Sequence, residues 1–283
     1  MGRNIALGAF DGLHIAHCAV LRGADAVLLF AEHPQKVLRG SAPPQLLTDE
    51  ERDERLQGMG IALLKVSFEE VARLGPEAFF CEVLLGRFGA AALRCGYHYR
   101  FGAGAAGDAA MLRALCRAHG LGLTVVPKVE YKGAAVSSTR IRAALRAGRM
   151  DDANAMLGRA FGYDFTVVEG ERVGRTLGVP TLNQRFPEGF AAPRNGVYAS
   201  QAYVGGRWRA SVTNVGRRPC FASDELRSET HVIGFEGDLY GRKVPVRLLR
   251  YLRPERRFDS LDELKKQIER DILLVEGCAL TKN

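Results

Sequence analysis

The sequence predicts an α/β protein in which a doubly wound parallel sheet is followed by a small antiparallel barrel and a C-terminal helix. Three observations lead to this prediction. The first half alternates short apolar segments with helical ones, as parallel sheets with crossover helices do. The second half has several strand patterns without helices between them. The last segment, 260–277, has apolar residues at helical spacing.

The elements of the first half follow from local patterns. The apolar run 26–31 suits a strand buried on both faces, and the capping box from Thr48 to Glu51 opens a helix. The expected strands are 4–9, 26–31, 62–68, 92–99 and 123–129, and the expected helices include 76–85, 108–118 and 138–148. A short helix, 151–157, ends at Gly158, which predicts a hinge. We therefore expect two domains, 1–157 and 158–283.

The second half begins with a predicted hairpin, 197–204 and 207–215, joined by Gly205 and Gly206. Two further strands, 231–235 and 244–252, flank a loop at 236–242. Ser260 and Glu263 form a second capping box. The helix after it has one apolar face, made by Leu261, Leu264, Ile268, Ile272 and Val275, and Gly277 is expected to end it. We expect this face to pack against the barrel.

Length and composition are those of a soluble globular protein with room for two domains. The chain has 283 residues, of which 47% are hydrophobic and 25% are charged. It has no apolar run of 18 residues, and its start lacks the apolar core of a signal peptide. The six cysteines are scattered without a CxxC pair, which favours reduced thiols. We expect a cytoplasmic protein with no membrane contact.

A histidine pair opens the first predicted helix. The run Gly8-Ala-Phe10-Asp11-Gly12-Leu-His14-Ile-Ala-His17 contains a strand end, a tight turn and a helix start. His14 and His17 are three residues apart and share a face of the first helical turn. A helix start at the carboxyl end of a parallel strand binds anions, and imidazoles there donate hydrogen bonds to phosphate. Spacing alone favours two surface histidines or half of a metal site, but the strand, turn and helix around them favour a phosphate site.

Two further segments carry similar chemistry. His33 closes the second predicted strand and so lies at the same edge of the sheet. Ser138, Thr139 and Arg140 offer hydroxyls, amides and a guanidinium at another helix start, although an ordinary N-cap followed by a surface arginine has the same pattern. Arg100 lies in an aromatic, positively charged loop at 96–102, for which a plain strand end is the alternative.

The segment 170–183, GERVGRTLGVPTLN, predicts a phosphate and magnesium site in the second half. Its glycines let backbone amides wrap phosphates, and two oxygen-bearing side chains, Thr181 and Asn183, lie two residues apart on one side of a predicted strand. Oxygen ligands of this kind suit a Mg²⁺ ion that keeps phosphate and water ligands. A hairpin loop with a strand start is the commoner meaning of such glycines taken alone.

The motifs together resemble a known family. In order, GAFDGLHIAH, AEHP, YHYRFG and SSTRIR resemble the HxGH nucleotidyltransferase superfamily, and more closely the bacterial bifunctional riboflavin kinase/FAD synthetase family. The second half resembles the riboflavin kinase module of that family through residues 174–183, 195–198, 214–219, 229–231, 238–241 and 252–258. The resemblance covers nearly the whole chain. It implies a six-stranded barrel with ATP and riboflavin in a cleft under loops.

The resemblance also implies two reactions and the residues for them. Riboflavin and ATP give FMN in the second domain, and FMN and a second ATP give FAD and pyrophosphate in the first. The implied catalytic residues are Glu229, which takes a proton from the ribityl 5′-hydroxyl, and His14, His17 and Arg140. The implied ATP and phosphate contacts are Gly8, Phe10, Asp11, Gly12, His33, Ser138, Thr139, Gly170, Gly174, Arg175, Thr176, Gly178 and Pro180. The implied flavin contacts are Arg100, Asn195 and Tyr198, and the Mg²⁺ ligands are Thr181 and Asn183.

Departures from the family pattern leave alternatives open. In the first half, Ala16 stands where the family has glycine, His98 stands where it has aspartate, and the loop 103–108 lacks the basic residues often found there. In the kinase half, Cys220 stands where the family has threonine. One alternative is a riboflavin kinase with a weak or silent adenylyltransferase domain. Another, suggested by the net charge of +8, is a nucleic-acid-binding protein, but the arginines are dispersed and no aromatic and basic cluster is visible. The expected partners are riboflavin, FMN and ATP without nucleic acid, and a homo-oligomer is left open.

Overall fold

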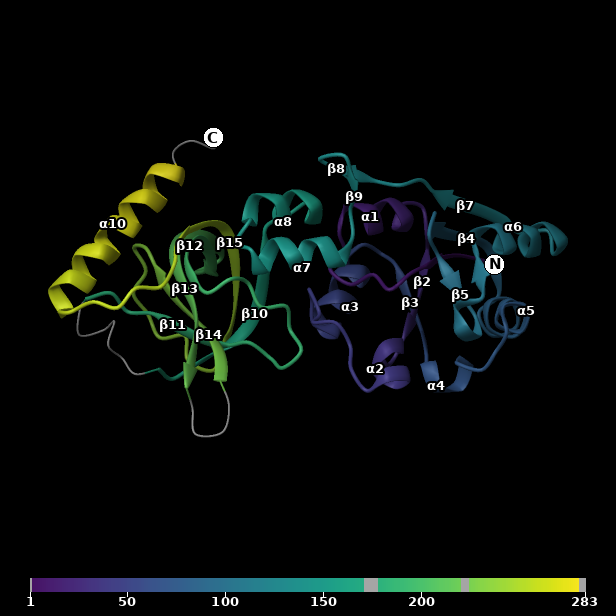
Figure 1. Ribbon diagram of the computed structural model, residues 1–283, viewed down its shortest axis with the longest axis horizontal. Helices are drawn as coiled ribbons and strands as arrows, with labels where there is room; N and C mark the ends of the chain where they lie inside the picture. The colour runs from purple at the N-terminus through teal and green to yellow at the C-terminus, as the bar shows by residue number, and fades with distance from the viewer. Residues whose placement is uncertain (1, 171–177, 220–223, 280–283) are drawn as a thin grey trace. The chain divides into compact units, whose positions relative to one another are not determined.

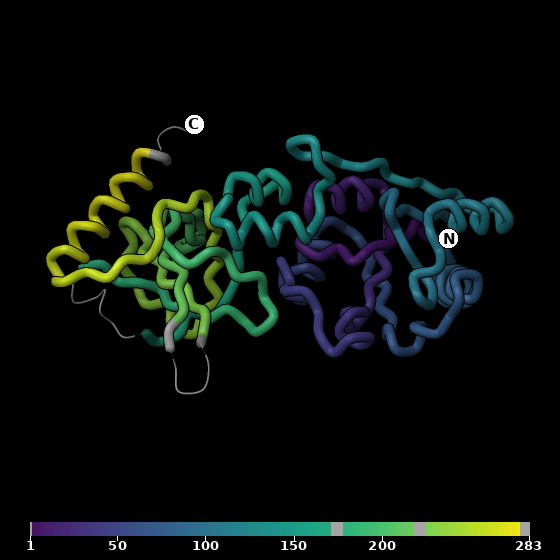
Figure 2. The backbone as a smooth tube through the Cα atoms, viewed as in Figure 1, coloured from purple at the N-terminus to yellow at the C-terminus, as the bar shows by residue number. Residues whose placement is uncertain are grey.

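The computed structural model describes residues 2–170, 178–219 and 224–279 of the chain. It divides into two compact units, Met1–Ser138 and Thr139–Asn283. Each unit is one continuous stretch of chain (Figures 1 and 2). The predicted domain boundary at residues 157 and 158 stays a prediction.

The first unit is built on a five-stranded parallel sheet, as predicted. Its strands, in spatial order, are β3 (Ala62–Val66), β2 (Ala26–Phe30), β1 (Arg3–Leu7), β4 (Ala90–Gly96) and β7 (Gly122–Val126). The chain runs outward from β1 to β3 and then returns to β4, so the switch point lies between β1 and β4. Ligands of such sheets bind at that crevice, outside the carboxyl ends of the strands.

Both faces of the sheet are covered. Ile5 and Leu7 of β1 belong to one apolar cluster, while Ala6 between them belongs to another. The surrounding helices are α1 (Ile15–Leu21), α2 (Pro34–Arg39), α3 (Asp49–Gly58), α4 (Phe68–Val71), α5 (Pro76–Ala78) and α6 (Ala109–Ala118). Burial on both faces explains why β2 reads as a continuous apolar run.

One predicted helix, 76–85, has a different form. It consists of α5 followed by the π-helix η1 (Phe79–Arg87), in which the backbone hydrogen bonds span five residues. The smaller elements of this unit are β5 (Arg100–Phe101), η2 (Ala103–Ala105), β6 (Gly107–Asp108), β8 (Glu130–Tyr131) and β9 (Ala134–Ala135). Cys18, Cys81, Cys95 and Cys116 carry free thiols.

The second unit contains the closed antiparallel barrel that the resemblance implies. Its strands, around the barrel, are β10 (Phe161–Val168), β11 (Leu182–Arg185), β14 (Asp224–Val232), β13 (Arg207–Pro219), β12 (Gly196–Val204) and β15 (Lys243–Arg253). The predicted hairpin is β12 and β13, and both glycines of its turn have positive φ angles, 61° and 75°. The predicted strand 231–235 is wrong, because β14 ends at Val232.

The interior of the barrel is partly polar. Ser200 hydrogen bonds to Ser211 and Thr213, and Thr213 to Thr230, at 2.7–2.9 Å. All four side chains are fully buried. Residues that alternate with them on each strand therefore face outward, and these outward positions include Glu229 on β14.

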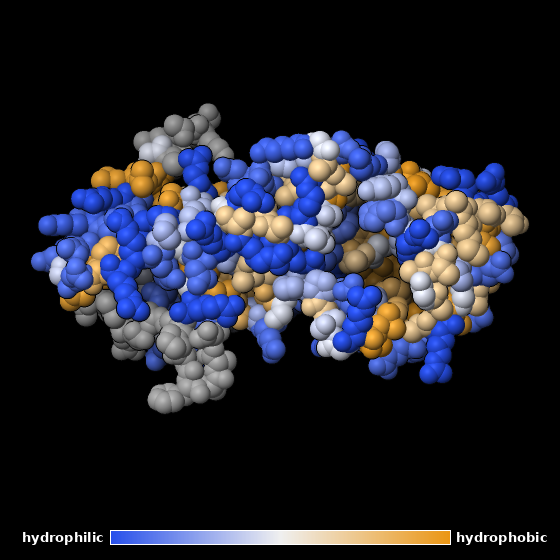
Figure 3. Space-filling model, viewed as in Figure 1, coloured by the Kyte–Doolittle hydropathy of each residue, from blue (hydrophilic) through white to orange (hydrophobic). Residues whose placement is uncertain are grey.

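Three helices complete the second unit: α7 (Ser138–Arg146), which starts at the last residue of the first unit, α8 (Met150–Leu157) and α10 (Leu261–Ala279). Ile272 and Val275 of α10 pack on Val197 and Val212 of the barrel, as predicted. Gly277 does not end α10, and Leu261 lies outside the apolar contact, 59% exposed. Figure 3 shows apolar side chains along this helix, where Leu261, Leu273 and Leu274 are exposed.

Candidate active sites

The turn after β1 brings two of the predicted motifs together. The Leu46 amide donates to the Asp11 carboxylate at 2.8 Å, and the Ser138 hydroxyl donates to the Asp11 carbonyl at 2.9 Å. Gly12 has a φ of +82°, and a Cβ there would lie 2.7 Å from the Leu46 side chain. The turn therefore needs glycine at this position. The hydrogen bonds from Leu46 and Ser138 hold it at the switch point of the sheet.

The two histidines of the first motif lie side by side. His14 is the N-cap of α1 and is buried, and its Nδ1 accepts from the His17 amide at 3.2 Å. The two rings stack with centroids 3.5 Å apart, and the Phe10 ring lies 5.3 Å from His17. Because Nδ1 of His14 accepts, its neutral ring carries the proton on Nε2 as a donor.

His17 is held in its neutral form. Burial first, and then the neighbouring His14 and His98, lower the pKa of His17 well below its usual value. A neutral imidazole still donates one hydrogen bond, as phosphate binding requires. The buried Nδ1 of His17 has no hydrogen-bond partner among the described residues. The ring therefore retains hydrogen-bonding capacity for a ligand.

The other residues predicted for the adenylyltransferase reaction lie at separate elements, and two of them, Thr139 and Arg140, belong to the second unit. His33 is the N-cap of α2 and accepts from the Gln35 amide at 3.1 Å, so its neutral ring also presents Nε2–H. Thr139 and Arg140 follow Ser138 in the first turn of α7. Arg100 is exposed on β5, 3.8 Å from the Asp108 carboxylate.

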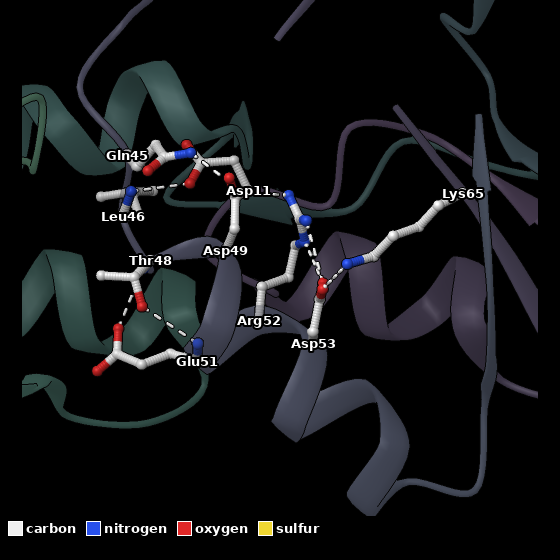
Figure 4. Close-up of polar contacts among 9 residues, drawn as sticks. All are labelled: Asp11, Gln45, Leu46, Thr48, Asp49, Glu51, Arg52, Asp53 and Lys65. Atoms are coloured by element: carbon white, nitrogen blue, oxygen red, sulfur yellow. Dashed lines mark hydrogen bonds and ion pairs between the residues drawn. The ribbon is translucent and has the colours of Figure 1, made fainter. Parts of the chain in front are cut away.

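Leu46, whose amide binds Asp11, lies just before the start of α3 (Figure 4). Thr48 accepts from the Glu51 amide and Glu51 accepts from the Thr48 amide, both at 3.1 Å, so the predicted capping box is confirmed. Arg52 pairs with Asp49 at 2.8 Å and with Asp53 at 3.0 Å (Figure 4). This bonding fixes the start of α3, whose N-cap Thr48 lies two residues after Leu46, and so supports the turn at Asp11.

The second unit has a pocket beside β11. It is lined by residues of four segments: Val167 and Gly170; Pro180, Thr181, Leu182 and Asn183; Val232 and Phe235; and Gly237, Asp238, Leu239 and Tyr240. Both predicted Mg²⁺ ligands, Thr181 and Asn183, therefore reach the same pocket. The loop 237–240 was not among the predicted site residues, although the turn-forming Asp238 and Gly237 signalled a loop there.

Three polar residues form a row across neighbouring strands of the barrel. Asn183 of β11 lies opposite Glu229 of β14, and Glu229 lies opposite Asn214 of β13. Residues paired in this way share one face of a sheet, with Cβ atoms about 5 Å apart. The predicted base is thus the direct neighbour of a predicted metal ligand.

Gly170 lies directly against Asn183. A Cβ on Gly170 would lie 2.7 Å from Oδ1 of Asn183 and 2.5 Å from its Cγ. Only glycine therefore leaves room for this amide at the pocket. Gly178 has a φ of +75°, as a loop glycine does. Gly174, Arg175, Thr176 and Cys220 lie outside the described residues.

The predicted flavin residues of this unit differ in exposure. Asn195 is exposed, and its carbonyl accepts from the Tyr251 hydroxyl at 3.4 Å. Tyr198 is fully buried and donates to the Arg194 carbonyl, and burial raises the pKa of its phenol well above the usual value. The structure thus gives Tyr198 a place in the core, where it anchors the residue before Asn195.

Comparison with known families agrees with both units. The FAD synthetase family model matches residues 1–140, and the riboflavin kinase family model matches residues 157–278. Together with the parallel sheet and the closed barrel, these matches define a two-domain class of flavin nucleotide-forming enzymes.

Similarity over the full length identifies the family. The bifunctional riboflavin kinase/FMN adenylyltransferase of Escherichia coli K12 is 34% identical, with 99% of this chain and 94% of the relative covered. The Bacillus subtilis protein of the same name is 31% identical, with 94% and 89% covered. This chain belongs to the bifunctional riboflavin kinase/FMN adenylyltransferase family.

A solved structure has the same fold. A crystal structure of a Streptococcus pneumoniae protein, described as a macrolide-efflux protein, superposes with a TM-score of 0.86 at 28% identity. The superposition covers 97% of the present chain and 94% of the Streptococcus pneumoniae chain. Within the described ranges, no helix of the present chain is both long and apolar enough to cross a membrane.

Proposed function

We propose that this chain makes both flavin nucleotides. The second unit phosphorylates riboflavin with ATP to give FMN, and the first unit transfers AMP from a second ATP to FMN, giving FAD and pyrophosphate. One observation carries the kinase assignment: Asn183 and Thr181 line one pocket, and Glu229 lies opposite Asn183 on the next strand. Phosphoryl transfer depends mainly on positioning and charge neutralisation, which such a site supplies.

In the kinase step, Glu229 accepts the proton of the ribityl 5′-hydroxyl. The oxygen then attacks the γ-phosphorus of ATP, the bond to the bridging oxygen breaks, and ADP leaves. A general base of this kind contributes typically ~10²–10⁴-fold. Gly170 and Gly178 permit close approach of the backbone to the phosphates. Asn195, exposed before β12, is the proposed flavin contact.

The residues at this pocket fit a Mg²⁺ ion. Thr181 supplies a hydroxyl oxygen and Asn183 an amide oxygen, and Mg²⁺ in nucleotide sites uses few protein oxygens together with phosphates and water. The absence of a side chain at Gly170 lets the Asn183 amide occupy its position at the pocket, where it would hold the ion. When bound, the ion would neutralise charge on the β- and γ-phosphates.

In the adenylyltransferase step, a phosphate oxygen of FMN attacks the α-phosphorus of ATP, and pyrophosphate leaves as the bridging bond breaks. His14 and His17 donate hydrogen bonds to phosphate oxygens, and His33 and Ser138 contribute further donors. The start of α1 at the switch point supports this assignment. A cytoplasmic location and the absence of nucleic-acid binding stay predictions.

Product analysis tests both activities. Purified protein is incubated with riboflavin, ATP and Mg²⁺, and the flavins are separated by chromatography. We expect FMN to appear first and FAD to follow, with FMN alone sufficient as substrate for FAD. Accumulation of FMN without FAD would leave only the kinase, as the alanine at position 16 and the histidine at position 98 first suggested. No turnover would contradict both assignments.

A further inference from the structure

His231 joins two segments of the kinase pocket that are far apart in the sequence. Its Nδ1 lies 2.9 Å from the Pro180 carbonyl oxygen. A carbonyl only accepts, so Nδ1 of His231 carries the proton and donates. His231 lies two residues after Glu229 on β14, so both side chains are on the same outward face of the barrel.

The hydrogen bond from His231 to Pro180 lies just beyond the point where the pairing of β11 with β14 ends. In the β11–β14 ladder, Asn183 is opposite Glu229 and Leu182 is opposite Thr230, and Leu182 is the first residue of β11. Thr181 thus precedes the strand, and strand pairing does not fix its backbone. The bond from His231 holds the carbonyl of Pro180, the residue directly before Thr181.

We infer that His231 is a positioning residue of the kinase site, which sets the Thr181 hydroxyl beside the Asn183 amide for the nucleotide and its metal ion. The inference rests on the proposed kinase function. Asn183 is held by its strand partners and by close packing against Gly170, whereas Thr181, outside the strand, is held by a long hydrogen bond of 3.5 Å from the Asn183 amide to its carbonyl and by the bond from His231 to the carbonyl before it. Pro180, Thr181 and Asn183 all line the pocket, so a shift of this segment changes the pocket wall directly.

A positioning role for His231 differs from a purely stabilising one in which ligands bind more weakly when the side chain is lost. A loose Thr181 weakens binding of the metal–nucleotide complex, while metal-free nucleotide and riboflavin, which do not use the Thr181 oxygen, are spared. If His231 had a purely structural role, its loss would weaken binding of the metal–nucleotide complex, of the metal-free nucleotide and of riboflavin together, or would lower only the thermal stability.

The test compares His231→Leu, which removes the donor, with His231→Asn, whose amide nitrogen can occupy the place of Nδ1. Gln201→Leu is the matched control, because Gln201 is also half-buried on the outer face of the barrel and loses one side-chain bond, to Arg247. Calorimetry on the full chain measures binding of ADP with and without Mg²⁺, and steady-state kinetics give the KM for riboflavin at saturating Mg·ATP.

We expect His231→Leu to weaken Mg·ADP binding about three- to tenfold, the range for one lost hydrogen bond. His231→Asn and Gln201→Leu should bind as the wild type does, and the riboflavin KM should stay within about twofold, because the lost bond acts on the metal–nucleotide complex alone. If His231→Leu fails to fold, His231→Phe carries the same expectation.

Three results would overturn the inference: unchanged Mg·ADP binding without the donor, equal loss in the asparagine variant, or equal loss in the control. Failure of the proposed function is a separate outcome. In that case the wild type itself would form no FMN and bind no Mg·ADP.

Discussion

Gly170 shows how the absence of a side chain determines where Asn183 lies at the pocket proposed for the kinase reaction. The amide of Asn183 occupies the space where a Cβ at residue 170 would lie. We expect Gly170→Ala to lower FMN formation more than tenfold, because Asn183 must turn away, a displacement of the kind that costs about 10²-fold at active sites. Conversion of FMN to FAD should persist, and chromatographic assays of the two steps measure both.

Gly277→Ala is the matched control for this prediction. Gly277 lies in α10 of the same unit, and a Cβ there meets nothing within 4 Å. The variant should form FMN at the wild-type rate and gain about 0.5–1 kcal/mol of helix stability. Normal kinase activity in Gly170→Ala would show that Asn183 does not need its present position.

Some candidate site residues follow from local sequence patterns, and others do not. Thr181 and Asn183 were predicted as a pair because residues two apart on a strand share a face, although β11 begins only at Leu182. The role of His231 was not predictable, because its bond to Pro180 joins residues 51 positions apart and depends on the register of β11 and β14. Burial of Tyr198 was also missed, since the pattern around it fits an exposed strand start equally well.

At the scale of elements, the capping box of α3 supports the adenylyltransferase turn. Thr48 and Glu51 satisfy each other's backbone amides at the helix start, two residues after the amide that binds Asp11. We expect Thr48→Ala to lower the free energy of unfolding by about 1 kcal/mol. Thermal unfolding measured by calorimetry should show the shift.

Thr48→Ser is the control, because serine also accepts the Glu51 amide and should retain most of the stability. Equal losses in the alanine and serine variants would mean that the threonine methyl group, rather than the cap, provides the stabilisation.

Whole elements were predictable where their apolar pattern is clear. The parallel strands, buried on both faces, appear as short apolar runs, and α10 has one apolar face. β14 was misplaced because its inward residues, Ser228 and Thr230, are polar, so the usual apolar alternation is absent. β10, which was not predicted, does show this alternation, since Phe161, Tyr163, Phe165 and Val167 are buried. The π-helix could not be predicted from the sequence, because its apolar residues fit an α-helix equally well.

At the scale of the whole molecule, the chain consists of two compact units, each with its own core and its own candidate site. Every described residue that lines the kinase pocket belongs to the second unit, whereas His14, His17 and Asp11 belong to the first. Loss of a side chain in one site therefore leaves the packing of the other unit unchanged, since distant substitutions act independently.

The two activities should therefore be lost separately. We expect Asn183→Ala to abolish FMN formation while FMN is still converted to FAD, because only the kinase pocket loses its amide. His17→Ala should do the reverse and lower FAD formation about 10²–10³-fold, the usual effect of removing one donor to a developing negative charge. Each variant is assayed with riboflavin and, separately, with FMN as substrate. Intact FAD formation in His17→Ala would mean that the stacked histidine pair at the start of α1 is not the adenylyltransferase site.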